Sequence, residues 1–234
     1  MNLVFRYALI PFINWGQYLF YLLIILIAAN KRFGLFGYFS KLAAFSKNLA
    51  ARLSYKSLIW LVLIFKIFYA LVETSSQYYV WSSSSFTKFF LSKGAVDLAL
   101  LKRFSGDLFI FLNNRFGYFI FYSWGRFWLE IFVSLIAAAV FYLFLVFLKK
   151  YKERFFEEGE TELGFLLAFM VGWSNFIVFL PVVFISVILV SVFKQLVFKE
   201  SYTTLGAPFL LAALIVLIFG NYLISLFGLM SLRV

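Results

Sequence analysis

The sequence contains no cysteine and no histidine, and only 3 of its 234 residues are proline. Without cysteine there can be no disulfide, no thiolate metal site and no thiol nucleophile. Without histidine the usual ligand of haem and the commonest general base are missing. We therefore expect no metal, no cofactor and no catalytic residue, so an enzyme is the function class with least support.

Charged residues are also scarce, at 13% of the chain, whereas 65% of the residues are hydrophobic and 35 are phenylalanine. Soluble domains are about 25% charged and about 45–50% apolar, and a single core of this size could not bury the excess. The apolar runs are long and continuous instead of alternating, which favours helices over barrel strands. The predicted fold class is all-α, a polytopic transmembrane helical bundle.

A bilayer crossing needs about 20 apolar residues, and the sequence predicts about five such spans in a single membrane domain, 1–234. The predicted spans cover residues of about 8–29, 57–81, 127–148, 163–193 and 205–231. The fourth is longer than a crossing requires, and Pro181 is its expected kink because proline lacks a backbone N–H.

Two further segments are predicted to be interfacial or re-entrant. Residues 33–53 combine lysine and arginine with apolar residues at helical spacing, which is typical of an amphipathic helix on a membrane surface. Residues 86–124 form the second segment, and Arg115 lies within its apolar stretch. An arginine at the centre of a span costs about 2.5–3.5 kcal/mol on insertion scales, so we do not expect this segment to cross.

The net charge is +11, and in a membrane protein this indicates basic loops lying against anionic lipid. Lys31 and Arg32 follow the first predicted span, and Lys149 and Lys150 follow the third. We expect these four residues to contact lipid headgroups. The acidic residues of 153–162 are expected in a solvated helical hairpin, and nucleic acid is not an expected partner because no nucleic-acid-binding motif accompanies the charge.

Small residues form a stripe with a spacing of four along the fourth predicted span. Gly164, Ala168 and Gly172 share one face, and Asn175 lies close to it. Such stripes let two helices approach closely inside a membrane. The stripe predicts helix packing, either within the protein's own bundle, which we favour, or against a partner subunit.

Three charged residues fall within predicted spans, namely Lys66 and Glu73 in the second and Glu130 at the start of the third. Charges at membrane depth are rare and often functional. One interpretation is an ion or proton path. The other, which we favour, is structural pairing of Glu73 or Glu130 with a nearby arginine such as Arg126.

A resemblance concerns the last third of the chain. Gly159-Glu160-Thr161-Glu162-Leu163, Gly172-Trp173 and Ala207-Pro208-Phe209-Leu210 are similar in spacing to the last third of the prepilin peptidases. That family has a catalytic aspartate where this chain has Glu160, and its second aspartate and its cysteine motif have no counterpart here. The resemblance implies an inactive relative of a membrane peptidase.

Taken together, these features predict a non-catalytic integral membrane subunit of a larger complex, whose partners are membrane lipids and other membrane subunits. The abundance of phenylalanine and the absence of histidine suit a T-rich organellar genome, so a respiratory-chain or ATP-synthase type subunit is one form of this hypothesis. The expected location is a mitochondrial or bacterial inner membrane. The alternative is a small transporter or channel that uses Lys66, Glu73 and Glu130.

Overall fold

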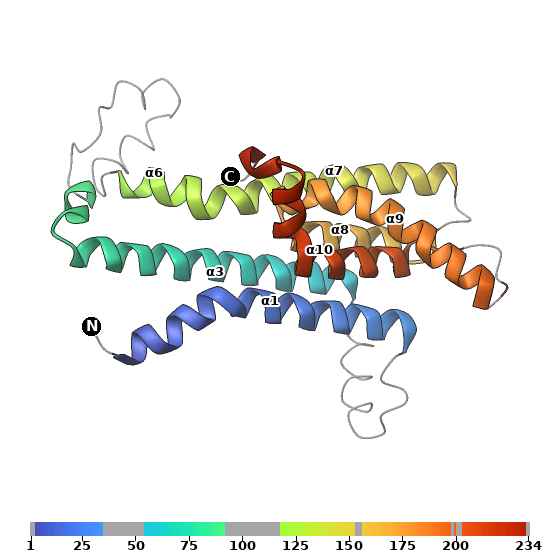
Figure 1. Cartoon of the computed structure of the whole chain (residues 1–234), viewed down its shortest axis with the longest axis horizontal. Coiled ribbons are helices and arrows are strands. Elements are labelled where there is room, and N and C mark those ends of the chain that lie inside the picture. The colour runs from blue at the N-terminus through green and yellow to red at the C-terminus, as the bar shows by residue number, and fades with distance from the viewer. Residues whose placement is uncertain are drawn as a thin grey trace. The chain divides into compact units, whose positions relative to one another are not determined.

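The structure, a computed structural model, describes residues 3–34, 54–91, 118–152, 156–197, 199 and 203–232, with side chains from Trp15 onward. Within these residues the chain is helical and has no strand (Figure 1). The α-helices are α1 Leu3–Phe33, α3 Tyr55–Ser83, α6 Phe119–Ser123, α7 Leu129–Tyr151, α8 Glu160–Val171, α9 Trp173–Val197 and α10 Gly206–Leu226. The shorter turns are η2 Thr87–Leu91, η3 Trp124–Trp128 and η5 Leu229–Leu232. The predicted all-α class is confirmed.

Four described segments are long and apolar enough to cross a membrane, namely Tyr55–Ser83, Phe119–Tyr151, Trp173–Val197 and Gly206–Leu226. The chain is therefore an integral membrane protein. The first predicted span, 8–29, lies inside α1, which has 31 residues. At a rise of about 1.5 Å per residue, a helix of that length exceeds the roughly 30 Å of the hydrocarbon layer.

Contacts divide the chain into two compact units. Unit 1 comprises Met1–Phe65 with Val133–Arg233, and unit 2 comprises Lys66–Phe132. The helices α3 and α7 each contribute residues to both units. That the whole chain forms a single membrane domain stays a prediction.

The helix α8 forms the centre of unit 1. Ten of its twelve residues are buried, and α10 packs against both α8 and α9. Phe141 of α7 completes the core through ring contacts with Phe176, Phe179 and Phe209, whose centroids lie 5.7, 6.1 and 6.0 Å away. The abundant phenylalanine of the sequence therefore serves partly as core packing.

The chain reverses direction at Gly172, and this corrects the prediction of one long span over 163–193. A Cβ placed on Gly164 would meet Phe209, near the start of α10, whereas a Cβ on Gly220, near the end of α10, would meet Asn175. The helix α10 thus runs parallel to α8, and Figure 1 shows that α9 runs antiparallel to both. Gly172 permits the reversal because its φ is +84°, a conformation that favours glycine. Pro181, the expected kink, lies inside α9 instead.

The reversal makes α8 a short helix that does not cross a bilayer. Its 12 residues extend about 18 Å, against roughly 30 Å of hydrocarbon. A chain reversal at membrane depth is stable only where protein surrounds it, which explains the deep burial of α8. As a consequence, the first residues of α8 and α10 lie at the same end of unit 1.

Unit 2 is built on aromatic contacts between α3 and α6. The ring of Trp81 lies 5.4 Å from Phe119 and 4.9 Å from Tyr122. From Phe119 the helix continues through the π-helical turn η3 into α7, so it begins eight residues before the predicted third span (127 − 119). Residues 119–124 therefore belong to a long helix and not to an interfacial segment. Most of both predicted interfacial segments, 35–53 and 92–117, lies outside the described residues.

Candidate functional site

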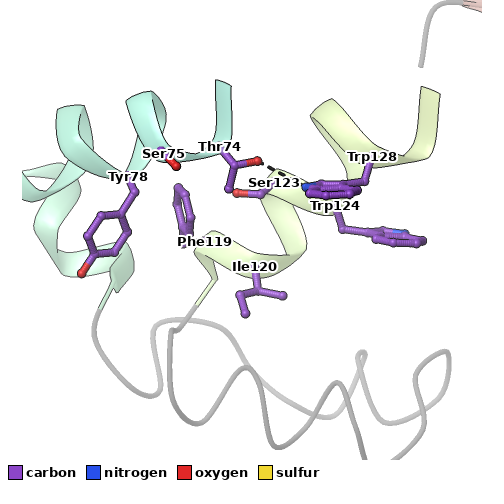
Figure 2. A pocket seen from close by; sticks show the side chains of 8 residues that line it. All are labelled: Thr74, Ser75, Tyr78, Phe119, Ile120, Ser123, Trp124 and Trp128. Atoms are coloured by element: carbon purple, nitrogen blue, oxygen red, sulfur yellow. Dashed lines mark hydrogen bonds between the residues drawn. The ribbon is translucent and has the colours of Figure 1, made fainter. Parts of the chain in front are cut away.

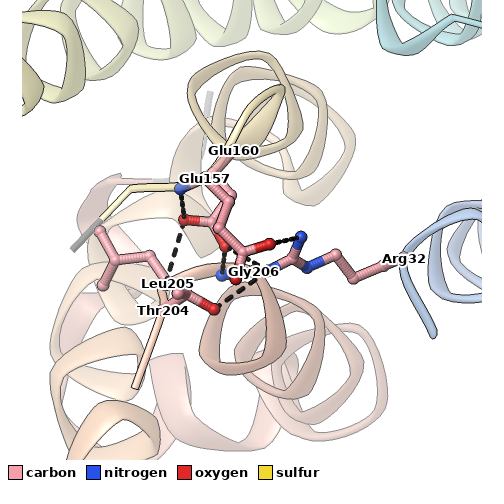
Figure 3. A network of polar contacts seen from close by, with 6 residues as sticks. All are labelled: Arg32, Glu157, Glu160, Thr204, Leu205 and Gly206. Atoms are coloured by element: carbon pink, nitrogen blue, oxygen red, sulfur yellow. Dashed lines mark hydrogen bonds and ion pairs between the residues drawn. The ribbon is translucent and has the colours of Figure 1, made fainter. Parts of the chain in front are cut away.

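A buried carboxylate stands at the end of unit 1 where α8 and α10 begin. Glu160, the first residue of α8, is 1% exposed. Its Oε1 accepts hydrogen bonds from the backbone N–H of Gly206 at 2.8 Å and from Nη2 of Arg32 at 3.0 Å. Its Oε2 accepts from the backbone N–H groups of Glu157 at 3.1 Å and Leu205 at 3.2 Å. Figure 3 shows these donors converging on the carboxylate from different segments.

Arg32 extends the cluster from α1, one residue before that helix ends. Its Nη2 also donates to Thr204 Oγ1 at 3.0 Å, and its Nη1 donates to the carboxylate of Glu157. One guanidinium thus joins the chain before α8, the first residue of α8 and the chain before α10. Such charge-assisted bonds are stronger than neutral ones, and the planar guanidinium suits several acceptors at once. We call Arg32, Glu157, Glu160, Thr204 and Gly206 the polar clamp.

Local backbone geometry explains why the clamp forms here. The first N–H groups of a helix have no partner within that helix, and they favour a negative charge. Leu205 and Gly206 supply two such groups at the start of α10, and Glu160 accepts both. Gly206 also leaves the necessary space, since an added Cβ would lie 2.8 Å from Glu160 Oε1 and 2.9 Å from Arg32 Nε.

The electrostatics of the clamp depend on Arg32. Glu157 is half exposed, and the hydrogen bond from Arg32 holds the pKa of this carboxyl below its usual value against a smaller opposing effect of burial. Lys194, near the end of α9, adds a further favourable charge interaction. The position of Lys194 is independent support for the chain reversal, because it places the end of α9 near the start of α8.

The chemistry of the clamp is that of a structural joint. A carboxylate has about four lone-pair sites, and four donors occupy those of Glu160. A general base must have a free acceptor within reach of the proton it removes. All of the acceptor sites of Glu160 are engaged, so its geometry suits the joining of three segments better than catalysis.

Two predictions are corrected by the clamp. Arg32 was expected to contact lipid headgroups, but its guanidinium is engaged by Glu157, Glu160 and Thr204. The acidic segment was expected to be solvated, but Glu160 is buried. The sequence offered one signal for Glu160, an acidic residue directly before a long apolar run. It offered no signal for Thr204, and none for the contact between Glu160 and Arg32, which is 128 residues away.

The small-residue stripe packs within the protein. Gly164 and Ala168 are buried in unit 1, and a Cβ on Gly164 would lie 2.4 Å from Leu145 of α7. Gly172 ends α8 and does not extend the stripe. The amide nitrogen of Asn175 donates to the Val171 carbonyl at 3.3 Å, across the reversal. The interpretation of the stripe as packing inside the bundle therefore agrees with the contacts.

The three intramembrane charges all lie in unit 2. Glu73 is half buried and is influenced by the charges of Glu130 and Arg126. The pairing of these acids with Arg126 and their role in an ion path both stay predictions. Lys66 is 4% exposed and lies two turns before Glu73 on the same helix.

Three other basic residues, Lys31, Lys149 and Lys150, were also predicted to contact lipid headgroups. The ammonium of Lys31 lies 5.2 Å from the centre of the Tyr55 ring, a cation–π contact. Lys149 is half buried and Lys150 is exposed at the end of α7. Their contact with lipid headgroups stays a prediction.

Nothing in the described part of the chain gathers three or more Asp or Glu side chains as a metal site would. The chain was also compared with models of protein families, with curated proteins and with solved structures, and none of them matches it.

Proposed function

We propose that this protein is a non-catalytic integral membrane subunit of a larger membrane complex. The observation that carries the proposal is the saturation of Glu160, the acid that the peptidase resemblance places at a catalytic position. Its carboxylate is buried and bonded to four donors, which supports a role in holding helices together.

The outer face of α9 is the surface that we assign to partner subunits and lipid. Large apolar side chains are exposed along it, including Phe184, Ile185, Ile188 and Val192. Inside a membrane, bulky aromatic residues of this kind suit packing against other helices or acyl chains. Lys149 and Lys150 are suited to anionic headgroups. The proposed location is a bacterial or mitochondrial inner membrane.

Native mass spectrometry after extraction in a mild detergent tests the proposal. We expect the 27.3 kDa chain to appear in a heavier complex that contains other polypeptides. The double variant Phe184→Ala, Ile188→Ala should release the chain, whereas Leu143→Ala, on the exposed face of α7, is a matched control. Recovery of the wild-type chain alone, or as a homo-oligomer, would refute the proposal.

A small transporter is the second candidate, and the chain reversal at Gly172 favours it. Helices that are interrupted inside the membrane often surround transported ions or substrates. Here α8 ends at Gly172, so its last carbonyl groups have no following turn of the same helix to bond to them. Flux into vesicles that contain the purified protein would test this candidate, since Lys66→Ala or Glu130→Gln should abolish the flux without changing the assembly.

A further inference from the structure

The helices α1 and α10 run antiparallel along unit 1. At one end, Arg32 of α1 donates to Thr204, two residues before α10 begins. Near the other end, the side-chain amide of Asn221 in α10 donates to the hydroxyl of Tyr18 in α1 at 3.5 Å. The 14 residues of α1 between these contacts (32 − 18) rise about 21 Å. We call the end of unit 1 that holds the polar clamp the clamp face.

The helix α3 starts at the clamp face and leads away from it. The ammonium of Lys31 lies 5.2 Å from the centre of the ring of Tyr55, the first residue of α3. Ten residues further along α3 (65 − 55), Phe65 stacks on Phe20 of α1 with 3.7 Å between the ring centres. Because Phe20 precedes Lys31 in α1, the two helices are antiparallel. The chain therefore arrives at the clamp face in α1 and leaves it in α3.

The chain between α7 and α10 leaves the clamp face and comes back to it. The helix α7 ends at Tyr151, and the clamp residue Glu157 follows six residues later (157 − 151). Lys194, near the end of α9, interacts with the charge of Glu157, and α10 begins at the clamp again. A segment that begins and ends on one side of a membrane crosses it an even number of times. The 12 residues of α8 are too few to cross, so α9 does not cross either.

Aromatic residues mark the level at which α3 and the helix that continues into α7 reach the opposite side. Figure 2 shows Tyr78, Trp124 and Trp128 around a cavity between α3 and this second helix. Tyr78 follows Tyr55 by 23 residues (78 − 55), and Trp128 precedes Tyr151 by 23 residues (151 − 128), a rise of about 35 Å. The hydrocarbon layer is about 30 Å thick, and tyrosine and tryptophan are enriched at both of its boundaries. Both helices therefore have the length and the aromatic residues of a complete crossing.

The charged residues indicate which side of the membrane the clamp face occupies. Within unit 1, every charged side chain that the structure describes lies at this end. The acidic ones all fall within 157–162, and basic ones outnumber them. The lysines at this face include Lys31, Lys56, Lys149, Lys150, Lys194 and Lys199. Because lysine and arginine are enriched on the cytoplasmic side of a membrane, where anionic headgroups attract them, the clamp face is suited to the cytoplasmic leaflet.

We propose that α8 and α9 form a re-entrant hairpin on the cytoplasmic side, and that α1, α3, the helix that continues into α7, and α10 are the four crossings. The hairpin turns at Gly172, about 18 Å of helix from the start of α8. The longer α9 returns at a slant, which Figure 1 shows. The first residues of α1 and the last residues of α10 then lie on the outer side. The inference does not depend on the proposed complex, because it concerns the path of this chain alone.

Labelling of single cysteines tests the proposal, because the chain has no cysteine of its own. Glu158→Cys and Lys199→Cys place a thiol at exposed positions before and after the hairpin, and Ser231→Cys places one at an exposed position after α10. Each full-length variant is expressed in a bacterial inner membrane and treated with a membrane-impermeant maleimide. We expect Glu158→Cys and Lys199→Cys to be labelled in inside-out vesicles and not in spheroplasts. Ser231→Cys should be labelled in spheroplasts and not in inside-out vesicles.

Leu143→Cys is the matched control, because residue 143 is exposed within the apolar part of α7 and should face acyl chains. It should be labelled from neither side until detergent dissolves the membrane, and labelling in detergent also shows that each thiol is reactive. Labelling of Glu158→Cys and Lys199→Cys from opposite sides would show that α9 crosses and would overturn the proposal. It would also be overturned if Ser231→Cys were labelled from the same side as Glu158→Cys, or if all three variants were labelled from the side opposite to the one expected.

Discussion

Nη2 of Arg32 lies 3.0 Å from Oε1 of Glu160, although the two residues are 128 positions apart in the chain. The contact joins the end of α1 to the start of α8, and Gly206 connects the same carboxylate to the start of α10. Three helices of unit 1 therefore meet at one ion pair, and the first predictions concern it.

Replacing Glu160 by glutamine should destabilise the fold strongly. The side chain keeps its size, but the change leaves Arg32 without its buried counter-charge and turns an amide NH2 toward other donors. Breaking one half of a buried ion pair typically costs about 3–5 kcal/mol. The measurement is thermal unfolding in detergent, followed by tryptophan fluorescence. Glu158→Gln, two residues earlier and exposed, serves as the control, and an equal loss in both variants would contradict a specific role for Glu160.

Arg32→Lys should destabilise the protein although it preserves the charge. Lysine is a point donor, whereas Arg32 contacts Glu157, Glu160 and Thr204 through a planar group. We expect a loss of about 1–3 kcal/mol, comparable to one or two charge-assisted hydrogen bonds. The same melting experiment measures it, with Lys31→Arg as the neighbouring control. An unchanged midpoint for Arg32→Lys would show that charge alone is sufficient.

The clamp should make the stability of the folded protein depend on pH at values below the ordinary pKa of a carboxyl group. Arg32 lowers the pKa of Glu157 in the folded protein, so the unfolded chain binds a proton more readily. The contribution of Glu157 is therefore complete above its ordinary pKa and is lost as the pH falls through the lowered folded pKa. Because Glu157 is half exposed, the effect is small.

Melting midpoints of wild type and Glu157→Gln, measured from about pH 6 to pH 3, isolate this contribution. We expect Glu157→Gln to be less stable at pH 6 and the two proteins to converge toward pH 3. A difference that stays constant with pH would be inconsistent with the charge interaction.

Gly172→Ala should disturb the reversal between α8 and α9. The backbone of Gly172 has φ +84° and ψ 168°, a region almost restricted to glycine, so a side chain there costs about 1–3 kcal/mol. Gly125→Ala is the matched control, because nothing lies within 4 Å of a Cβ added at that helical position. Equal melting midpoints for the two variants would argue against the reversal.

Hydropathy was sufficient to predict the helical class and the apolar segments, since continuous apolar runs need no tertiary information. It could not reveal the reversal at Gly172, because residues 163–193 are equally apolar before and after the turn. The one available signal was the length of this apolar run, which exceeds a single crossing, and from it we expected a kink at Pro181. The pairing of Arg32 with Glu160 was beyond reach for a different reason. The approach of the two residues depends on α8, α9 and α10 folding back on one another, a relationship that local pattern does not encode.

The polar clamp also imposes an order on synthesis. Arg32 leaves the ribosome 174 residues before Gly206 (206 − 32), the last residue to contribute to the clamp. At roughly 5–20 residues per second, that interval lasts about 10–35 seconds. Glu160 follows Arg32 after 128 residues and Thr204 after 172, so for most of this time the guanidinium has neither of them to accept its hydrogen bonds. The nascent chain therefore carries the charge of Arg32 at the end of α1 without its clamp partners, and these partners are supplied when the last third of the chain is translated.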